Sequence, residues 1–143
     1  MSRQRRDERG SVSIWAALIV AAFTLILGIS VDLVGQVAAK QRAADVAAQA
    51  ARIAAEQVDP NTVLSGAKTI TANPVRARQA ALAYIAGADM TGTVTIGAGG
   101  TQLAITTTAT YQPLFLTSIG IGPLTVTGTS TARLVRTLNG SER

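Results

Sequence analysis

The chain has 143 residues, of which 48% are hydrophobic but only 3% aromatic; its formal net charge is +5, and it contains no cysteine and no histidine. The missing cysteines exclude a disulfide framework and a thiolate metal site, and the missing histidines remove the commonest general base and the commonest metal ligand. The positive charge does not indicate a nucleic-acid-binding protein, because the basic residues cluster near the amino terminus or are scattered, and few aromatic side chains could stack on bases.

A basic segment, residues 1–9, precedes a run from Gly10 to Val31 that contains no charged residue. About 20 helical residues cross the roughly 30 Å hydrocarbon core of a bilayer, whereas the apolar part of a cleavable signal has typically about 7–15 residues. We therefore expect residues 10–33 to form a retained transmembrane helix, with release by signal peptidase as the alternative. Because basic residues are in excess before the span, we expect a single-pass protein of the cytoplasmic (inner) membrane, with a cytoplasmic tail at residues 1–9 and an extracytoplasmic carboxyl-terminal domain.

Asp32 is the only charged residue between Arg9 and Lys40, and it lies at the outer end of this predicted span. A charge at that depth costs less than one at the centre of the bilayer. Two interpretations follow. Asp32 either reaches the lipid headgroups or forms an intersubunit pair with a cationic group of a neighbouring protein.

Residues 34–58 are rich in alanine, contain no proline and are expected to continue the same helix, since alanine is the best helix former. One line of small side chains follows this segment at spacings of three and four residues. It includes Ala44, Ala48, Ala51 and Ala55. Such a seam allows another backbone to come close, so it packs either on the protein's own domain or on a second helix of an assembly. We take these four alanines as a candidate helix-assembly seam.

Residues 59–73 are expected to be a linker, residues 74–138 a small extracytoplasmic domain and residues 139–143 a flexible tail. Asn73 followed by proline is typical of a helix start, with the asparagine as cap and the proline at the first helical position. We expect that helix to end at Gly87.

Three runs then alternate apolar with polar residues, at 94–96, 103–111 and 124–134, and threonine is common among them. Alternation of this kind predicts β-strands with one buried and one solvated face. The expected fold class is α+β, in which a long amino-terminal transmembrane and extended α-helix is followed by a small domain with one helix and an antiparallel three-stranded sheet.

The segment at residues 113–123, between the second and third strands, carries several large apolar side chains between two prolines. It either folds over one end of the core or forms an exposed contact patch.

The residues suited to catalysis do not cluster in the sequence. Eight acidic residues are present, and Asp89 is the one of them that falls inside the small domain. The glycines at 97–100 are a weak match to a phosphate loop, because a threonine-rich strand follows rather than a helix. We expect no enzymatic activity, no cofactor, no metal and no small-molecule substrate.

Residues 5–58 resemble the TadE/TadG-like proteins of tight-adherence (Flp) pilus systems, including their actinobacterial relatives. The stretch RGSVSIW is similar to the family's charged segment that ends in glycine before the apolar helix, and VDLVGQVAAKQRAADVAAQAA is similar to its aspartate followed by a basic turn and an alanine-rich helix. The resemblance implies a membrane-anchored, pilin-like component that assembles in the lipid bilayer with other pilin-like subunits or pilus-assembly membrane proteins. It also implies that the protein has no cofactor and no activity of its own.

The family's processing motif is incomplete here. Members cut by prepilin peptidase have a glutamate five residues after the glycine at the cut, and this chain has Trp15 at that place. We therefore expect an uncut anchor, and cleavage between Gly10 and Ser11 stays the alternative. A membrane-tethered module that binds an envelope ligand is the alternative function.

Overall fold

The computed structural model describes residues 8–57, 64, 69–97 and 101–137. Its elements, in chain order, are α1 (Glu8–Ala55), β1 (Thr69–Thr71), α3 (Pro74–Gly87), β2 (Thr91–Ile96), β3 (Gln102–Tyr111), the 3₁₀ helix η1 (Leu116–Ile119), β4 (Leu124–Arg133) and β5 (Val135–Thr137). The long apolar helix, the second helix and the antiparallel three-stranded sheet of the predicted α+β fold are all present.

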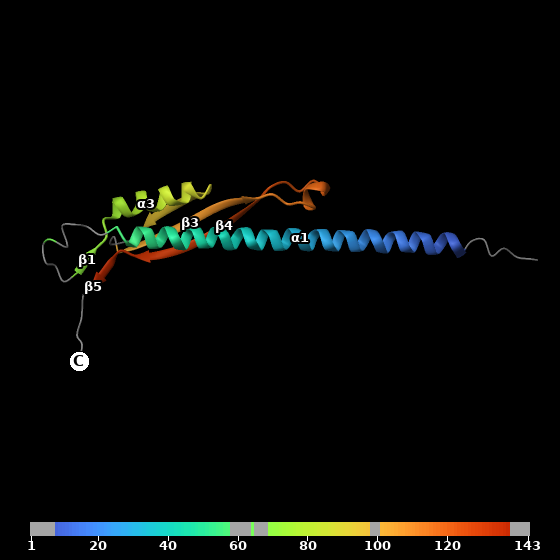
Figure 1. The fold of residues 1–143 in the computed structure, drawn as a ribbon, viewed down its shortest axis with the longest axis horizontal. Helices are drawn as coiled ribbons and strands as arrows, with labels where there is room; N and C mark the ends of the chain where they lie inside the picture. The colour runs from blue at the N-terminus through green and yellow to red at the C-terminus, as the bar shows by residue number, and fades with distance from the viewer. Residues whose placement is uncertain (1–7, 58–63, 65–68, 98–100, 138–143) are drawn as a thin grey trace, which may run out of the picture.

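Helix α1 is one uninterrupted helix of 48 residues, about 70 Å long at 1.5 Å per residue. Its amino-terminal half extends beyond the rest of the protein, and its carboxyl-terminal half lies against the sheet and α3 (Figure 1). The predicted continuity across residues 33 and 34 is confirmed, since the segment contains no proline to interrupt it.

The main sheet has the order β2-β3-β4, and both strand pairs are antiparallel. Buried residues alternate along β3 at Leu103, Ile105 and Thr107, so one face of the sheet is covered and the other is exposed. Helix α1 packs against β3 and β4, and α3 packs against α1 and β2.

Helix α3 begins as predicted. The side chain of Asn73 accepts hydrogen bonds from the backbone N–H groups of Val75 and Arg76, both at 3.1 Å, and proline occupies the first helical position. The helix ends at Gly87.

A second, two-stranded sheet pairs β1 with β5 in antiparallel register, Thr69 opposite Thr137. The prediction of a linker at 59–73 is therefore wrong for Thr69–Thr71. The backbone of this short strand is paired with a segment more than 60 positions away in the chain, and nothing in its local sequence specifies that partner. The rest of the predicted linker up to residue 68, apart from Leu64, and the predicted tail at 139–143 lie outside the described residues.

The core lies between α1, α3 and the covered face of the sheet. It is built from small side chains on the helices and larger ones on the strands. Its buried members include Ala47, Ala50, Ala54, Ala77, Ala81, Ile85, Val94, Leu103 and Ile105. Alanines on both helices let the backbones approach closely, which compensates in part for the small apolar area that each alanine buries.

Helix α1 approaches the sheet closely at Gly128 of β4. A Cβ atom placed there would overlap backbone atoms of Ala43 and Ala44. Next to this contact, the buried hydroxyl of Thr107 donates to the carbonyl oxygen of Ala43 at 2.7 Å and lies 3.3 Å from that of Gly128. The glycine therefore permits a hydrogen-bonded contact between a helix and a sheet that a side chain would separate.

Candidate functional site

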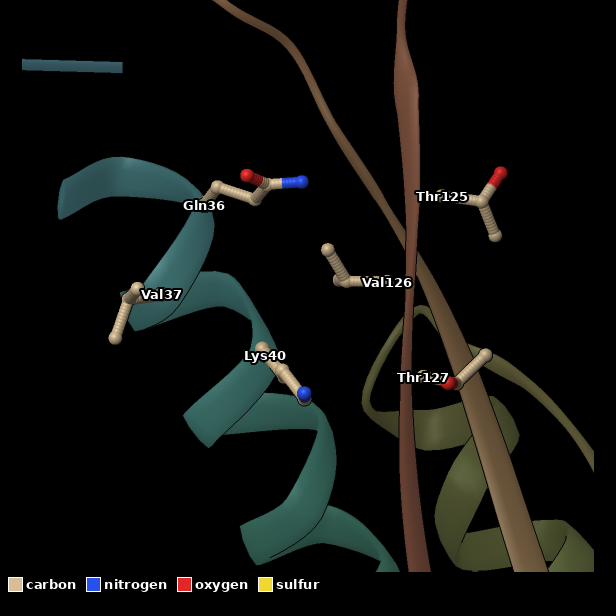
Figure 2. Close-up of a pocket in the computed structure, with 6 residues that line it drawn as sticks. All are labelled: Gln36, Val37, Lys40, Thr125, Val126 and Thr127. Atoms are coloured by element: carbon tan, nitrogen blue, oxygen red, sulfur yellow. The ribbon is translucent and has the colours of Figure 1, made fainter. Parts of the chain in front are cut away.

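The surface hollows of the described residues are shallow, and the groove between α1 and β4 illustrates their chemistry. It has a volume of about 370 Å³ and is lined by Gln36, Val37, Lys40, Thr125, Val126 and Thr127. Figure 2 shows Val126 directed from β4 toward α1, whereas the two threonine side chains project from the opposite side of the strand. Lys40 has no acidic partner among these lining residues, and the hydroxyl-bearing side chains of Thr125 and Thr127 project from the other side of the strand, so the groove brings no acid or nucleophile toward the lysine.

Metal ligation has no candidate within the part of the chain that the structure describes. No group of three or more His, Cys, Asp or Glu residues lies close enough together to hold an ion.

The most elaborate polar arrangement is the junction between α1 and the end of the β3–β4 hairpin, centred on Asp32. This carboxylate is 1% exposed. Its Oδ1 accepts hydrogen bonds from the backbone N–H of Leu114 at 2.7 Å and from the phenol of Tyr111 at 3.3 Å. Its Oδ2 accepts from the N–H groups of Phe115 at 2.9 Å and Leu116 at 2.7 Å.

Asp32 thus performs the role of a helix cap from a different element. The first backbone N–H groups of a helical segment have no partner within the helix, and here a carboxylate of α1 accepts from the N–H of Leu116, the first residue of η1, and from those of the two residues before it. Burial of an unpaired carboxylate would be costly, and the four donors replace the water that burial removes. The charge at the end of the apolar run is therefore satisfied within the protein.

Tyr111 is affected by the same arrangement. Burial of its phenol and the negative charge of Asp32 both raise its pKa above the ordinary value, because both disfavour the phenolate.

Two glycines complete the face of α1 that receives this junction. Gly28 and Gly35 lie four residues before and three residues after Asp32, so all three share one side of the helix. A Cβ at Gly28 would lie within 3.0 Å of the side chain of Phe115, and a Cβ at Gly35 would overlap the ring of Tyr111. The missing side chains are what allow both aromatic rings to lie against the helix.

The structure corrects both sequence-based interpretations of Asp32. The carboxylate neither reaches outward to headgroups nor stands free for a cationic group of a neighbouring subunit, because its own chain surrounds it. A signal for the observed role was present in the glycines at 28 and 35, whose spacing leaves space on each side of the aspartate.

The candidate assembly seam lies at the margin of the intramolecular contact. Of its four members Ala51 is 4% exposed, and Ala44, Ala48 and Ala55 are half-buried. The fully buried line runs one residue earlier, about 100° around the helix, through alanines 43, 47, 50 and 54. The alanine-rich half of α1 therefore packs on its own domain through this buried line.

Gly10 and Ser11, the candidate processing site, both lie within α1, and Ser11 is exposed. The region that follows is also exposed. Between Val12 and Leu27 the large apolar side chains have exposed fractions of 52–69%. By length and composition α1 is able to cross a membrane, as an anchor or as a signal sequence.

Comparison with protein-family models, with curated proteins and with solved structures found no match. The resemblance of residues 5–58 to the TadE/TadG-like family therefore remains a prediction from sequence motifs.

Proposed function

We propose that the chain is a non-enzymatic, membrane-anchored structural subunit of the TadE/TadG-like kind. Its helix α1 crosses the cytoplasmic membrane with the amino end inside and assembles with other pilin-like subunits or pilus-assembly membrane proteins. The observation that carries this proposal is the division of α1 into two halves, of which one packs on the small domain and the other is apolar and exposed.

The exposed half needs an apolar environment. Each square ångström of apolar surface moved out of water contributes about 25 cal/mol, and the large side chains between Val12 and Leu27 are all more than half exposed. The small domain does not cover them, because its contacts with the helix begin at Gly28 and lie toward the carboxyl-terminal end. A bilayer, together with the helices of other subunits within it, supplies the apolar surroundings that the small domain does not give to these side chains.

The alanine seam supports assembly less directly than the apolar half does. Ala51 is covered within the chain, so an alanine-rich helix is also what a simple tether with this domain would need. The surface left for neighbouring subunits is the uncovered circumference of the apolar half and the margin at Ala44, Ala48 and Ala55.

Single-cysteine crosslinking in the native host tests the assembly, since the chain has no cysteine of its own. Leu18→Cys and Ile26→Cys place thiols at positions 58% and 60% exposed, and Ala47→Cys places one at a fully buried position as the matched control. Labelled with a thiol-reactive photoactivatable benzophenone, the two exposed variants should crosslink to small membrane proteins that mass spectrometry identifies as pilin-like or as pilus-assembly components, and the buried variant should not. Crosslinks to lipid alone, or to nothing, would favour a simple tether.

Topology and processing are tested separately. Reporter fusions after Arg143 should behave as extracytoplasmic, and cytoplasmic activity would refute the orientation. Intact mass of the membrane fraction should retain the amino-terminal segment. A mature terminus at Ser11 would establish pilin-type processing, whereas one near Lys40 would mean that the chain is secreted.

A further inference from the structure

The end of the β3–β4 hairpin, residues 113–123, is an exposed apolar surface, which we name the hairpin tip. The exposed fractions are 72% for Leu114, 46% for Phe115, 61% for Ile119 and 39% for Ile121. Of the two interpretations from sequence, the exposed patch is the one that the structure shows, since these side chains do not close the core.

The hairpin tip lies beside α1 at the end of its apolar run. Phe115 rests on Gly28, and the backbone at the start of η1 is bound to Asp32. Figure 1 shows the tip in orange alongside the middle of α1, at the limit of the small domain that faces the exposed amino-terminal half. If residues 10–33 span the bilayer, the tip is level with the outer edge of its hydrocarbon core.

The chemistry of the hairpin suits a bilayer surface. No charged residue occurs between Asp89 and Arg133, so β3, the tip and β4 as far as Ala132 carry no charged side chain. A segment that carried arginine, lysine or acidic residues at this depth would be expensive to place in lipid.

Much of the backbone of the tip is hydrogen-bonded within the protein. Asp32 accepts from the N–H groups of Leu114, Phe115 and Leu116. Further along, the N–H of Ile121 donates to the carbonyl of Leu116 at 2.9 Å, and those of residues 118 and 120 donate to carbonyls of residues 115 and 117. Backbone groups satisfied within the protein remove the main cost of moving a non-helical segment into an apolar phase.

We propose that the hairpin tip inserts into the outer leaflet of the same bilayer that α1 spans, so that the domain is held to the membrane at two places. This inference rests on the proposed membrane anchoring. The contact fixes the rotation of α1 about its axis and the distance of the sheet from the membrane, because Asp32 and Gly28 join the tip to one face of the helix. A bilayer is favoured over a protein partner because the tip is continuous with the exposed apolar surface of α1 and presents no charge.

A fluorescence experiment on the full-length chain in phospholipid vesicles tests the insertion. Ile119→Cys carries an environment-sensitive nitrobenzoxadiazole probe on the hairpin tip. Thr131→Cys, exposed near the far end of β4, is the matched control, and Phe23→Cys reports on the span. Each variant is compared for quenching by aqueous iodide and by doxyl-labelled phospholipid.

The probe at residue 119 should be shielded from iodide, quenched by the doxyl lipid and blue-shifted, while the probe at residue 131 should show the reverse. Equal behaviour at 119 and 131, with the probe at 23 in lipid, would overturn the insertion but leave the anchor intact. Shielding at 119 from both quenchers would mean that a protein covers the tip and would also overturn it. Exposure at 23 to iodide would contradict the anchor and the insertion together.

Discussion

Replacement of Gly128 by alanine tests whether the close contact between α1 and β4 holds the small domain together. Alanine adds one methyl group, and in this position that methyl would overlap the backbone of Ala43 and Ala44 rather than the flexible end of a side chain. The helix and the sheet must therefore separate, and the hydrogen bond from Thr107 to the carbonyl of Ala43 lengthens or breaks.

The expected loss is a balance of three terms. Overpacking of a well-packed contact costs about 1–3 kcal/mol, and loss of the Thr107 hydrogen bond costs about 0.5–1.5 kcal/mol. Alanine also lowers the conformational entropy of the unfolded chain relative to glycine, which stabilises the folded state by about 0.4–1 kcal/mol. The free energy of unfolding of the domain should fall by about 0.5–4 kcal/mol, which accelerates exchange through global unfolding by about 2- to 1,000-fold.

Amide hydrogen exchange of β3 and β4 peptides, measured by mass spectrometry on the full-length protein in detergent, provides the readout. The matched control is Gly87→Ala, because a Cβ at that position meets nothing within 4 Å and alanine is the better helix former. Exchange of the Gly128→Ala strands at the rate of the parent or of the control would refute the reasoning, since it would mean that no steric contact of this kind exists.

Three further predictions follow from the same contacts. Ala47→Leu, at a fully buried position, should lower the free energy of unfolding by about 1–3 kcal/mol, whereas Ala48→Leu, half-buried at the margin, should lower it less. Equal losses for the two variants in denaturant unfolding would contradict the assigned face of α1. Asp32→Asn replaces one acceptor oxygen by a donor, so the backbone amides of residues 114–116 should exchange hydrogen faster while those of the strands change little. Unchanged protection of these three amides would contradict the capping role. The pKa of Tyr111 is raised from 10.0 in the folded state, so the stability that this phenol contributes is present below about pH 10 and is lost as the pH rises through the raised value. Denaturant unfolding should therefore show that Tyr111→Phe loses less stability than the parent at alkaline pH. Parallel plots of unfolding free energy against pH for the two proteins would contradict this prediction.

The sequence by itself determined the elements whose signals are local. The absence of proline and the abundance of alanine and leucine specify one long helix, an asparagine before a proline specifies the start of α3, and alternation specifies the three strands of the main sheet. These patterns depend on neighbours along the chain, so no partner has to be known. The strands β1 and β5 have no such pattern, because three residues are too few to show alternation and their pairing is between distant segments.

The face of α1 that packs and the role of Asp32 were decided only by the tertiary structure. Alanine occupies adjacent positions, 43 and 44, 47 and 48, 50 and 51, and 54 and 55, so two stripes about 100° apart are equally apolar and the periodicity does not choose between them. The sheet packs on the stripe that contains Ala43, because Gly128 allows the helix backbone to come close at that residue. In the same way, the donors that surround Asp32 lie about 80 positions further along the chain, and they meet the carboxylate only when the hairpin folds back along the helix.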